Sequence, residues 1–153
     1  MKILVTGGAG FIGSNFIVNF IDKHKILNYD KLTYAANLNN LDSIESHPNY
    51  SFVKGDIMDG KKIKQVFNEF EPDVVINFAA ESHVDRSIDA PKTFIQTNIL
   101  GTYELLNASL VYYKNLDVQN RFKFLHISTD EVYGSLSDKG KFTESNPYKP
   151  SSP

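Results

Sequence analysis

A hydroxyl residue and two adjacent carboxylates follow an apolar segment at Thr129, Asp130 and Glu131. Two carboxylates can act as general acid and general base when their surroundings separate their proton affinities. Polar groups at the carboxyl end of a strand are costly unless they are used. In a regular strand Asp130 and Glu131 point to opposite faces, so both reach one substrate only if the chain turns there. Two solvated loop acids are the alternative.

Glycines recur every third residue at Gly7, Gly10 and Gly13, between an apolar segment and a segment of helical period. Gly7 permits a tight turn, Gly10 lets the backbone approach a pyrophosphate, and Gly13 lets a helix pack closely on a sheet. The helix N-terminus offers free N–H groups to the anion. The pattern predicts a dinucleotide-binding turn, and a P-loop is excluded because no Gly-Lys-Ser/Thr follows.

Carboxylates also follow the next two apolar segments. Asp30 ends the second one, where it can accept hydrogen bonds from the ribose hydroxyls of adenosine. Because this charge would repel a 2′-phosphate, the predicted cofactor is NAD rather than NADP. Asp56, beside Ile57, can lie near the adenine amino group. A solvated aspartate at a strand end is the alternative for both.

The fourth apolar segment leads into small residues and then polar ones. Ala79 and Ala80 would let the chain pass beside a nicotinamide ribose at the carboxyl edge of a sheet. His83 and Arg86 follow, and they either meet substrate phosphates or are simply solvated.

Composition excludes several classes of protein. The 153 residues carry a formal net charge of −2 without a long run of one sign, which does not suggest nucleic acid or a membrane surface as partner. The absence of cysteine excludes disulfides and thiolate metal sites, and the four histidines lack ligand spacing, so we expect no metal. We expect no signal peptide or membrane span, and therefore a cytoplasmic protein.

The elements that must position these residues alternate along the chain as strands and helices do in an α/β fold with a parallel sheet. Apolar runs predict strands over 2–5, 25–29, 51–54, 73–77 and 121–127. Two helices are predicted to turn apolar stripes toward the sheet, one with Ile12, Phe16 and Phe20, the other with Ile63, Val66, Phe67 and Phe70. A third is predicted from about Asp89 to Asn115, with Ile95, Ile99 and Leu106 on one side and Gly101 inside it.

Four segments together resemble the dTDP-glucose 4,6-dehydratase family of extended short-chain dehydrogenases/reductases. They are 6–13 (TGGAGFIG), 29–35 (YDKLTYA), 79–88 (AAESHVDRSI) and 128–134 (STDEVYG). The resemblance covers essentially the whole chain. It implies a Rossmann-type doubly wound parallel sheet with strand order 3-2-1-4-5 over residues 1–153.

The resemblance implies NAD as the cofactor. It assigns cofactor contacts to Gly7, Gly10, Phe11, Ile12, Gly13, Asp30, Lys31, Leu32, Thr33, Asp56, Ile57, Phe78, Ala79, Ala80, Glu81, Ser82 and Thr97. Substrate contacts fall to Ser82 and Thr129, and catalysis to Thr129, Asp130 and Glu131. Glu131 is the expected base at the sugar C5. Asp130 is the expected acid for the departing C6 hydroxyl, a role that burial of its carboxyl would favour.

The chain departs from the family in two places. Ala36 stands where the family usually has glycine, so alanine is expected to accommodate a loop position that tolerates positive φ. A catalytic tyrosine with a lysine four positions on is expected after a segment like 150–153, and we expect no such pair in this chain. We therefore expect the amino-terminal part of a longer enzyme, without the substrate-binding domain and without turnover by itself. Strand 121–127 would then expose an apolar edge.

Other readings stay open. A nucleotide-sugar epimerase, a decarboxylase or a UDP-glucose 4,6-dehydratase of the same superfamily would share most of these motifs, and a non-catalytic NAD-binding module is the alternative from another class. The family is usually dimeric through helices, one of which corresponds to residues 93–113, so a homodimer is the expected state of the full-length protein.

Overall fold

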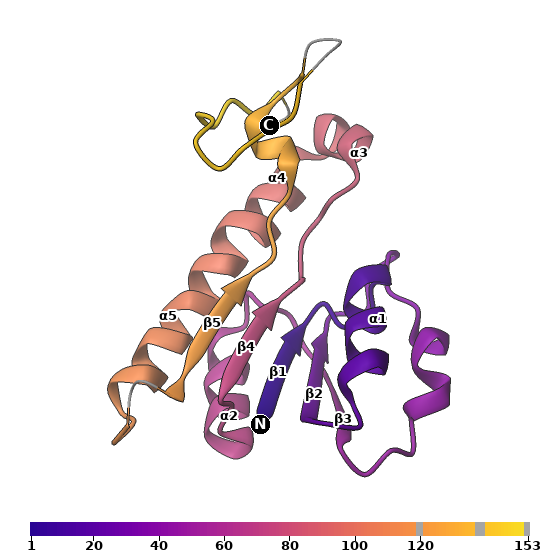
Figure 1. The fold of residues 1–153 in the computed structure, drawn as a ribbon, viewed down its shortest axis with the longest axis vertical. Helices are drawn as coiled ribbons and strands as arrows, with labels where there is room; N and C mark the ends of the chain where they lie inside the picture. Colours follow the sequence, from indigo (N-terminus) through magenta and orange to yellow (C-terminus); the bar gives the residue numbers. More distant parts are fainter. Residues whose placement is uncertain (119–120, 137–139, 152–153) are drawn as a thin grey trace.

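The sheet is parallel and has five strands in the order β3-β2-β1-β4-β5. The structure is a computed structural model that describes residues 1–118, 121–136 and 140–151. The strands are β1 (Lys2–Thr6), β2 (Lys25–Asp30), β3 (Tyr50–Lys54), β4 (Val74–Asn77) and β5 (Lys123–His126). All five point toward the same end of the molecule, the top of Figure 1. The predicted α/β class and strand order are confirmed.

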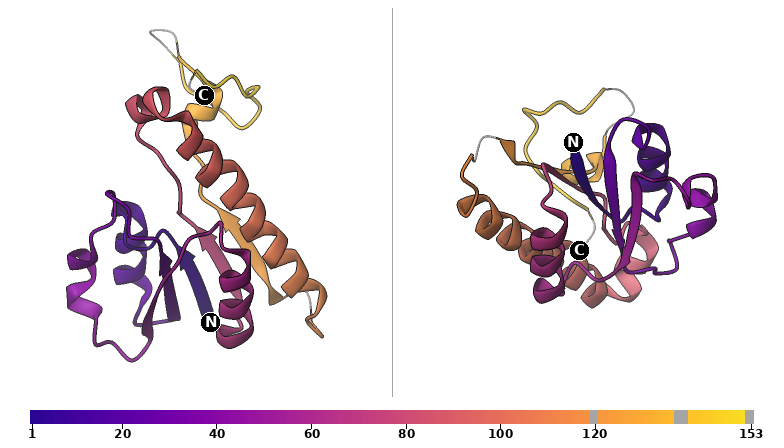
Figure 2. Two further views of the ribbon diagram at one scale, coloured as in Figure 1. Left: turned by 180° about the vertical axis from the view of Figure 1, so that it is seen from behind. Right: turned by 90° about the horizontal axis from the view of Figure 1, so that it is seen from below.

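Helical segments connect the strands. They are α1 (Phe11–Phe20), the 3₁₀ helix η1 (Leu38–Ile44), α2 (Gly60–Phe70), α3 (Val84–Asp89), α4 (Pro91–Phe94), the π-helical η2 (Ile95–Gly101), α5 (Thr102–Lys114) and the 3₁₀ turn η4 (Asp130–Tyr133). The two views of Figure 2 show α4, η2 and α5 as one long rod beside the sheet.

Each face of the sheet has its own core, because successive residues of a strand point to opposite faces. Leu4 of β1 packs with residues of α2 and α5, such as Phe67 and Leu105. Its neighbours Ile3 and Val5 pack with α1 and η1 on the other face. The buried strands read as continuous apolar runs for this reason, which is why the sequence revealed them.

The predicted stripe of α2 is correct, but that of α1 is wrong. Ile63, Val66, Phe67 and Phe70 are all buried. In α1 the buried residues are Gly13, Ser14 and Ile17, whereas Ile12 and Phe20 are exposed and Phe16 is half-buried. Gly13 packs against the glycine turn, where a Cβ would run into the backbone of Gly7 and Gly8. This contact, rather than the apolar period, sets the rotation of the helix.

The third predicted helix begins at Pro91, close to its expected start, but it is divided. Its middle, η2, is π-helical, and α3, for which no helix was predicted, precedes it. Ile95, Ile99 and Leu106 do share a side, and that side is exposed. Gly101 is buried, and a Cβ at Gly101 would lie 2.7 Å from Cγ1 of Ile57. Close packing therefore explains this glycine.

The structure differs from two further expectations and tests a third only in part. β5 is shorter than the predicted strand 121–127, although it is an edge strand. The left-handed residue of the loop after β2 is Leu32, with φ 60°, and not Ala36. Segment 150–153, which the resemblance placed before a catalytic tyrosine, lies partly outside the described residues.

Within the described ranges, no helix combines the length and the apolar character needed to cross a membrane. The same residues contain no cluster of three or more histidine, aspartate or glutamate side chains placed to hold a metal ion.

Candidate functional site

A cavity of about 900 Å³ opens at the carboxyl edge of the sheet. It is lined by the loops that follow β1, β2, β3, β4 and β5, together with residues of η2 and α5. In open α/β sheets ligands bind at this edge, where the connections diverge to opposite faces. Here that point lies between β1 and β4, because β2 and β3 lie on one side of β1 and β4 and β5 on the other.

The glycine turn forms the floor of the cavity. Gly7 has a φ of 72°, and a Cβ there would lie 2.5 Å from the backbone nitrogen of Ala79. Gly10 is the N-cap residue of α1, and no side chain caps this end of the helix. The first N–H groups of α1 therefore lack a side-chain partner at the edge of the cavity, as a pyrophosphate site requires.

Asp30 is held at the end of β2 by two backbone amides. Its Oδ2 accepts a hydrogen bond from the N–H of Ala9 at 2.9 Å, and its Oδ1 accepts one from the N–H of Leu32 at 2.7 Å. The second bond stabilises the left-handed conformation of Leu32. The carboxylate is thus fixed beside the glycine turn, where its remaining lone pairs can accept from sugar hydroxyls.

Asp56 lines the cavity after β3, the strand that neighbours β2. Its Oδ2 lies 2.7 Å from Nζ of Lys31, and its Oδ1 accepts from the N–H of Met58 at 3.0 Å. Its carbonyl oxygen accepts from the hydroxyl of Tyr29 at 2.9 Å. Burial raises the pKa of Tyr29, and the carboxylates of Asp59 and Asp56 raise it further. Tyr29 is therefore a neutral hydrogen-bond donor that positions this loop.

A polar network centred on the buried Asn77 supports the end of β4. Oδ1 of Asn77 accepts from the hydroxyl of Thr6 at 2.5 Å and from the N–H of Ala79 at 3.2 Å. Its Nδ2 lies 3.1 Å from Nδ1 of His126. Since the amide nitrogen can only donate, His126 accepts through Nδ1. The network joins the ends of β1, β4 and β5 beneath the cavity.

Asn98 of η2 fixes the chain that follows. Its Oδ1 accepts from the N–H of Glu81 and its Nδ2 donates to the carbonyl of Glu81, both at 2.8 Å. This paired contact holds residues 79–82 along the wall of the cavity.

The carboxylates after β5 lie in a turn, not a strand. Thr129 is the N-cap of η4, and its hydroxyl accepts from the N–H of Glu131 at 3.2 Å. Thr129, Asp130 and Glu131 consequently all line the one cavity, as the sequence analysis required. All three are exposed in this chain, so the expected burial of Asp130 is not found.

The predicted site residues come together with few exceptions. All of the proposed catalytic, cofactor and substrate positions line the cavity except Leu32, whose N–H supports Asp30 instead. His83 and Arg86 are not among the lining residues, and Arg86 stacks on Tyr34. Contrary to expectation, one tyrosine does have a lysine four positions on. That pair, Tyr50 and Lys54, lies on β3 away from the cavity.

Sequence reasoning missed several residues that shape the site. The sequence could have indicated Asn77, since it is an amide at the end of a buried apolar strand. Nothing in the sequence indicates the contacts of Asn98 or the pairing of Lys31 with Asp56, because the partners are distant in sequence.

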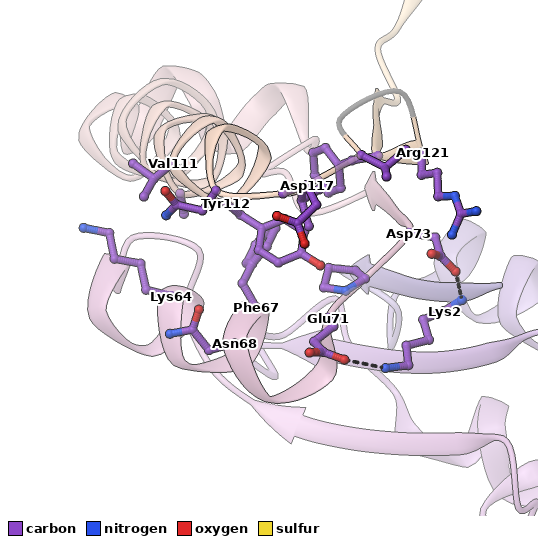
Figure 3. A pocket seen from close by; sticks show the side chains of 16 residues that line it. Lys2, Lys64, Phe67, Asn68, Glu71, Asp73, Val111, Tyr112, Asp117 and Arg121 are labelled. Atoms are coloured by element: carbon purple, nitrogen blue, oxygen red, sulfur yellow. Dashed lines mark hydrogen bonds and ion pairs between the residues drawn. The ribbon is translucent and has the colours of Figure 1, made fainter.

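A second hollow, of about 730 Å³, lies near the amino-terminal ends of β1 and β4, between α2 and α5 (Figure 3). Its charged residues include Lys2, whose ammonium lies 3.1 Å from Glu71 and whose backbone N–H donates to Asp73. None of the predicted site residues lines it.

Residues 4–153 match the family model described as GDP-mannose 4,6 dehydratase. The chain is 56% identical over 153 residues to a dTDP-glucose 4,6-dehydratase of Xanthomonas campestris pv. campestris (strain B100), covering 98% of this chain and 44% of that protein. It is 52% identical to the enzyme of the same name from Haemophilus influenzae, covering 100% of this chain and 47% of that protein. The chain thus spans about half the length of these curated relatives.

Solved structures agree. The dTDP-glucose 4,6-dehydratase of Bacillus anthracis, crystallised with NAD, superimposes with a TM-score of 0.84 at 46% identity, covering 100% of this chain and 45% of that one. The Streptomyces venezuelae enzyme of the same name, also with NAD bound, gives a TM-score of 0.88 at 40% identity and covers 99% and 46%. By its sequence match and its sheet, this chain belongs to the GDP-mannose 4,6-dehydratase family.

Proposed function

We propose that this chain is the NAD-binding part of a nucleotide-sugar 4,6-dehydratase that converts dTDP-glucose to dTDP-4-keto-6-deoxyglucose. The observation that carries the proposal is the single cavity lined both by the glycine turn and by Thr129, Asp130 and Glu131. A cofactor on the turn and a sugar against the carboxylates would share one space. Relatives named dTDP-glucose 4,6-dehydratase, 48% to 56% identical, support the choice of substrate.

The residues at the turn fit NAD. The space above Gly7 is too narrow for a side chain, and the adjoining start of α1 can receive a pyrophosphate. The fixed carboxylate of Asp30 would accept from the adenosine ribose and would repel a 2′-phosphate. Asp56 and Ile57 would contact adenine, and residues 78–82 with Thr97 the nicotinamide half. The nicotinamide, if held there, would supply the hydride acceptor for the sugar C4 and the hydride donor for C6.

The residues after β5 would bind the sugar and transfer protons to and from it. The hydroxyl of Thr129 would bind the sugar beside its C4 oxygen. The carboxylate of Glu131 would remove the C5 proton, which a C4 ketone makes acidic, and Asp130 would protonate the departing C6 hydroxyl. Asp130 is exposed in this chain, so the substrate and the rest of the enzyme would have to bury its carboxyl.

The direct test is to incubate the whole protein that contains this chain with dTDP-glucose, UDP-glucose or GDP-mannose and to weigh the products by mass spectrometry. We expect loss of one water from dTDP-glucose. A product of unchanged mass would instead indicate an epimerase. No product from any of the three would contradict the dehydratase and leave a decarboxylase or a non-catalytic NAD-binding module.

The role of Glu131 is tested in deuterated water. We expect Glu131→Gln to lower deuterium incorporation at C5 by about a hundredfold or more, because the variant lacks the base. Asp130→Asn is the matched control, and it should slow water loss while C5 still exchanges. Undiminished exchange in Glu131→Gln would remove this residue from the role.

The whole enzyme would act as a homodimer. A row of apolar side chains runs along η2 and α5 away from the sheet, and its members are 45% to 61% exposed: Ile95, Ile99, Tyr103, Leu106 and Leu110. Such a row on a long helix suits pairing with a second copy.

A further inference from the structure

Three side chains meet at the side of the cavity, and one of them, Glu81, lines it. The guanidinium carbon of Arg86 lies 3.7 Å from the ring centroid of Tyr34, which places a cation over an aromatic face. The hydroxyl of Tyr34 donates to Oε2 of Glu81 at 3.2 Å. We name Tyr34, Glu81 and Arg86 the latch. Glu81 belongs to the cavity wall, whereas Tyr34 and Arg86 are not among the lining residues.

The latch joins segments from two strands that are not neighbours. Tyr34 follows β2, whereas Glu81 and Arg86 follow β4. β1 lies between these strands, and the glycine turn follows β1. The contact therefore bridges the point at which a dinucleotide pyrophosphate would lie.

Both joined segments are anchored elsewhere. The loop of Tyr34 is tied to Ala9, whose N–H donates to Asp30 and whose carbonyl accepts from the N–H of Asn37 at 2.9 Å. Glu81 is held at its backbone by Asn98. The latch is thus a side-chain link between two fixed ends, and neighbours of its members line the cavity, among them Thr33 and Ser82.

We propose that the latch closes the cofactor cleft and slows the departure of the dinucleotide, which rests on the proposed function. A 4,6-dehydratase must keep its reduced cofactor until the hydride returns to the same sugar. Tyr34 and Arg86 are positioning residues in this scheme. Their contacts are exposed and weak, so the latch can open for exchange.

The experiment measures cofactor release from the whole protein. The protein is loaded with NADH and mixed with excess NAD, and the loss of bound NADH fluorescence gives the release rate. Tyr34→Ala and Arg86→Ala should each release NADH about two- to fivefold faster, the effect of one exposed cation–π contact. Tyr34→Phe keeps the ring beneath Arg86 and should fall between wild type and Tyr34→Ala.

Matched controls lie far from the latch. Tyr113→Ala, toward the end of α5, and Arg121→Ala, at the second hollow, should release NADH at the wild-type rate. Unchanged release in both Tyr34→Ala and Arg86→Ala would overturn the latch. If the wild-type protein retains no NADH at all, the proposed function fails, and the latch fails with it.

A double variant separates a latch from two independent contacts. If Tyr34 and Arg86 act through each other, Tyr34→Ala with Arg86→Ala should be no faster than the faster single variant. Acceleration equal to the product of the two single effects would contradict the latch.

Discussion

Gly7 and Gly10 of the glycine turn differ in backbone conformation and in the room that each leaves for a Cβ. Gly7 has a left-handed φ and no room for a Cβ beside Ala79. Gly10 has a φ of −75°, and a Cβ there would meet only the carbonyl oxygen of Gly7, at 3.3 Å. The first glycine is required by the fold, and the second leaves space that a ligand can use.

We therefore expect Gly7→Ala to lower the free energy of unfolding by about 2 kcal/mol or more, since it combines left-handed strain with a backbone clash. Gly10→Ala should cost under about 1 kcal/mol of stability but weaken NAD binding at least about tenfold. Denaturant unfolding and NAD titration of the two variants check both statements. Equal losses of stability would contradict the distinction.

Tyr29 makes the stability of the fold depend on pH in the alkaline range. Its raised pKa means that the unfolded chain releases the phenol proton first as the pH rises. The folded state then binds more protons than the unfolded state, so stability falls with pH. Stability from this group is complete below about pH 10, the ordinary tyrosine value, and is lost above it.

The prediction is a decline in the free energy of unfolding above about pH 10, at up to about 1.4 kcal/mol per pH unit for this tyrosine. Burial also raises the pKa of Tyr50 and Tyr112, which adds to the slope. Tyr29→Phe should flatten the decline and cost about 1 kcal/mol at neutral pH through the lost bond to Asp56. An unchanged slope would show that another group is responsible.

Among the elements, the start of α2 is set by its N-cap residue, Asp59. Oδ1 of Asp59 accepts from the N–H of Lys62 at 3.0 Å and caps the helix. We expect Asp59→Ala to destabilise the protein by about 1 kcal/mol, whereas Asp59→Asn, which keeps an acceptor oxygen, should cost much less. Thermal or denaturant unfolding of both variants is the measurement, and equal losses would contradict capping as the cause.

The other elements show where sequence reasoning succeeds. Strands buried on both faces had to be apolar throughout, so their positions could be predicted, whereas their order came from the family resemblance. The face of α1 could not, because its rotation depends on contact between Gly13 and the turn. The row Ile95, Ile99 and Leu106 was predicted to share one side of a helix, but the sequence did not indicate that this side is exposed.

Some parts of the candidate site could be predicted from the sequence, and others could not. The glycine turn and the Thr129 to Glu131 turn consist of neighbours in sequence, so their types and spacing revealed them. Asn98 and Tyr34 act through partners that only the folded chain brings near, so no local pattern marks them. Arg86 was a candidate from its type, but its partner Tyr34 was not predicted.

For the whole molecule, the two faces of the sheet are unequally covered. α2 and α5 cover one face, where they pack on residues of β1, β2 and β4 such as Leu4, Tyr29 and Val75. Figure 1 shows α1 beside β1 and β2 and away from β5. Leu125 of β5 is 50% exposed. Leu125 pairs in register with Ile76, which belongs to the core beneath α1. Residues of the larger enzyme that we propose would cover this strand, whereas the row on η2 and α5 would remain for a second copy.

The apolar row on η2 and α5 predicts the surface through which two copies of the whole protein would pair. In the whole protein we expect Ile99→Glu with Leu106→Glu to convert a dimer to a monomer, because each carboxylate would be buried without a partner at the interface. Val18→Glu, a change at an exposed aliphatic residue of α1, should leave the dimer intact. Light scattering after size-exclusion chromatography measures both. A dimer that survives the double change would show that the second copy binds elsewhere, since the row is too apolar for two glutamates to be tolerated within a contact.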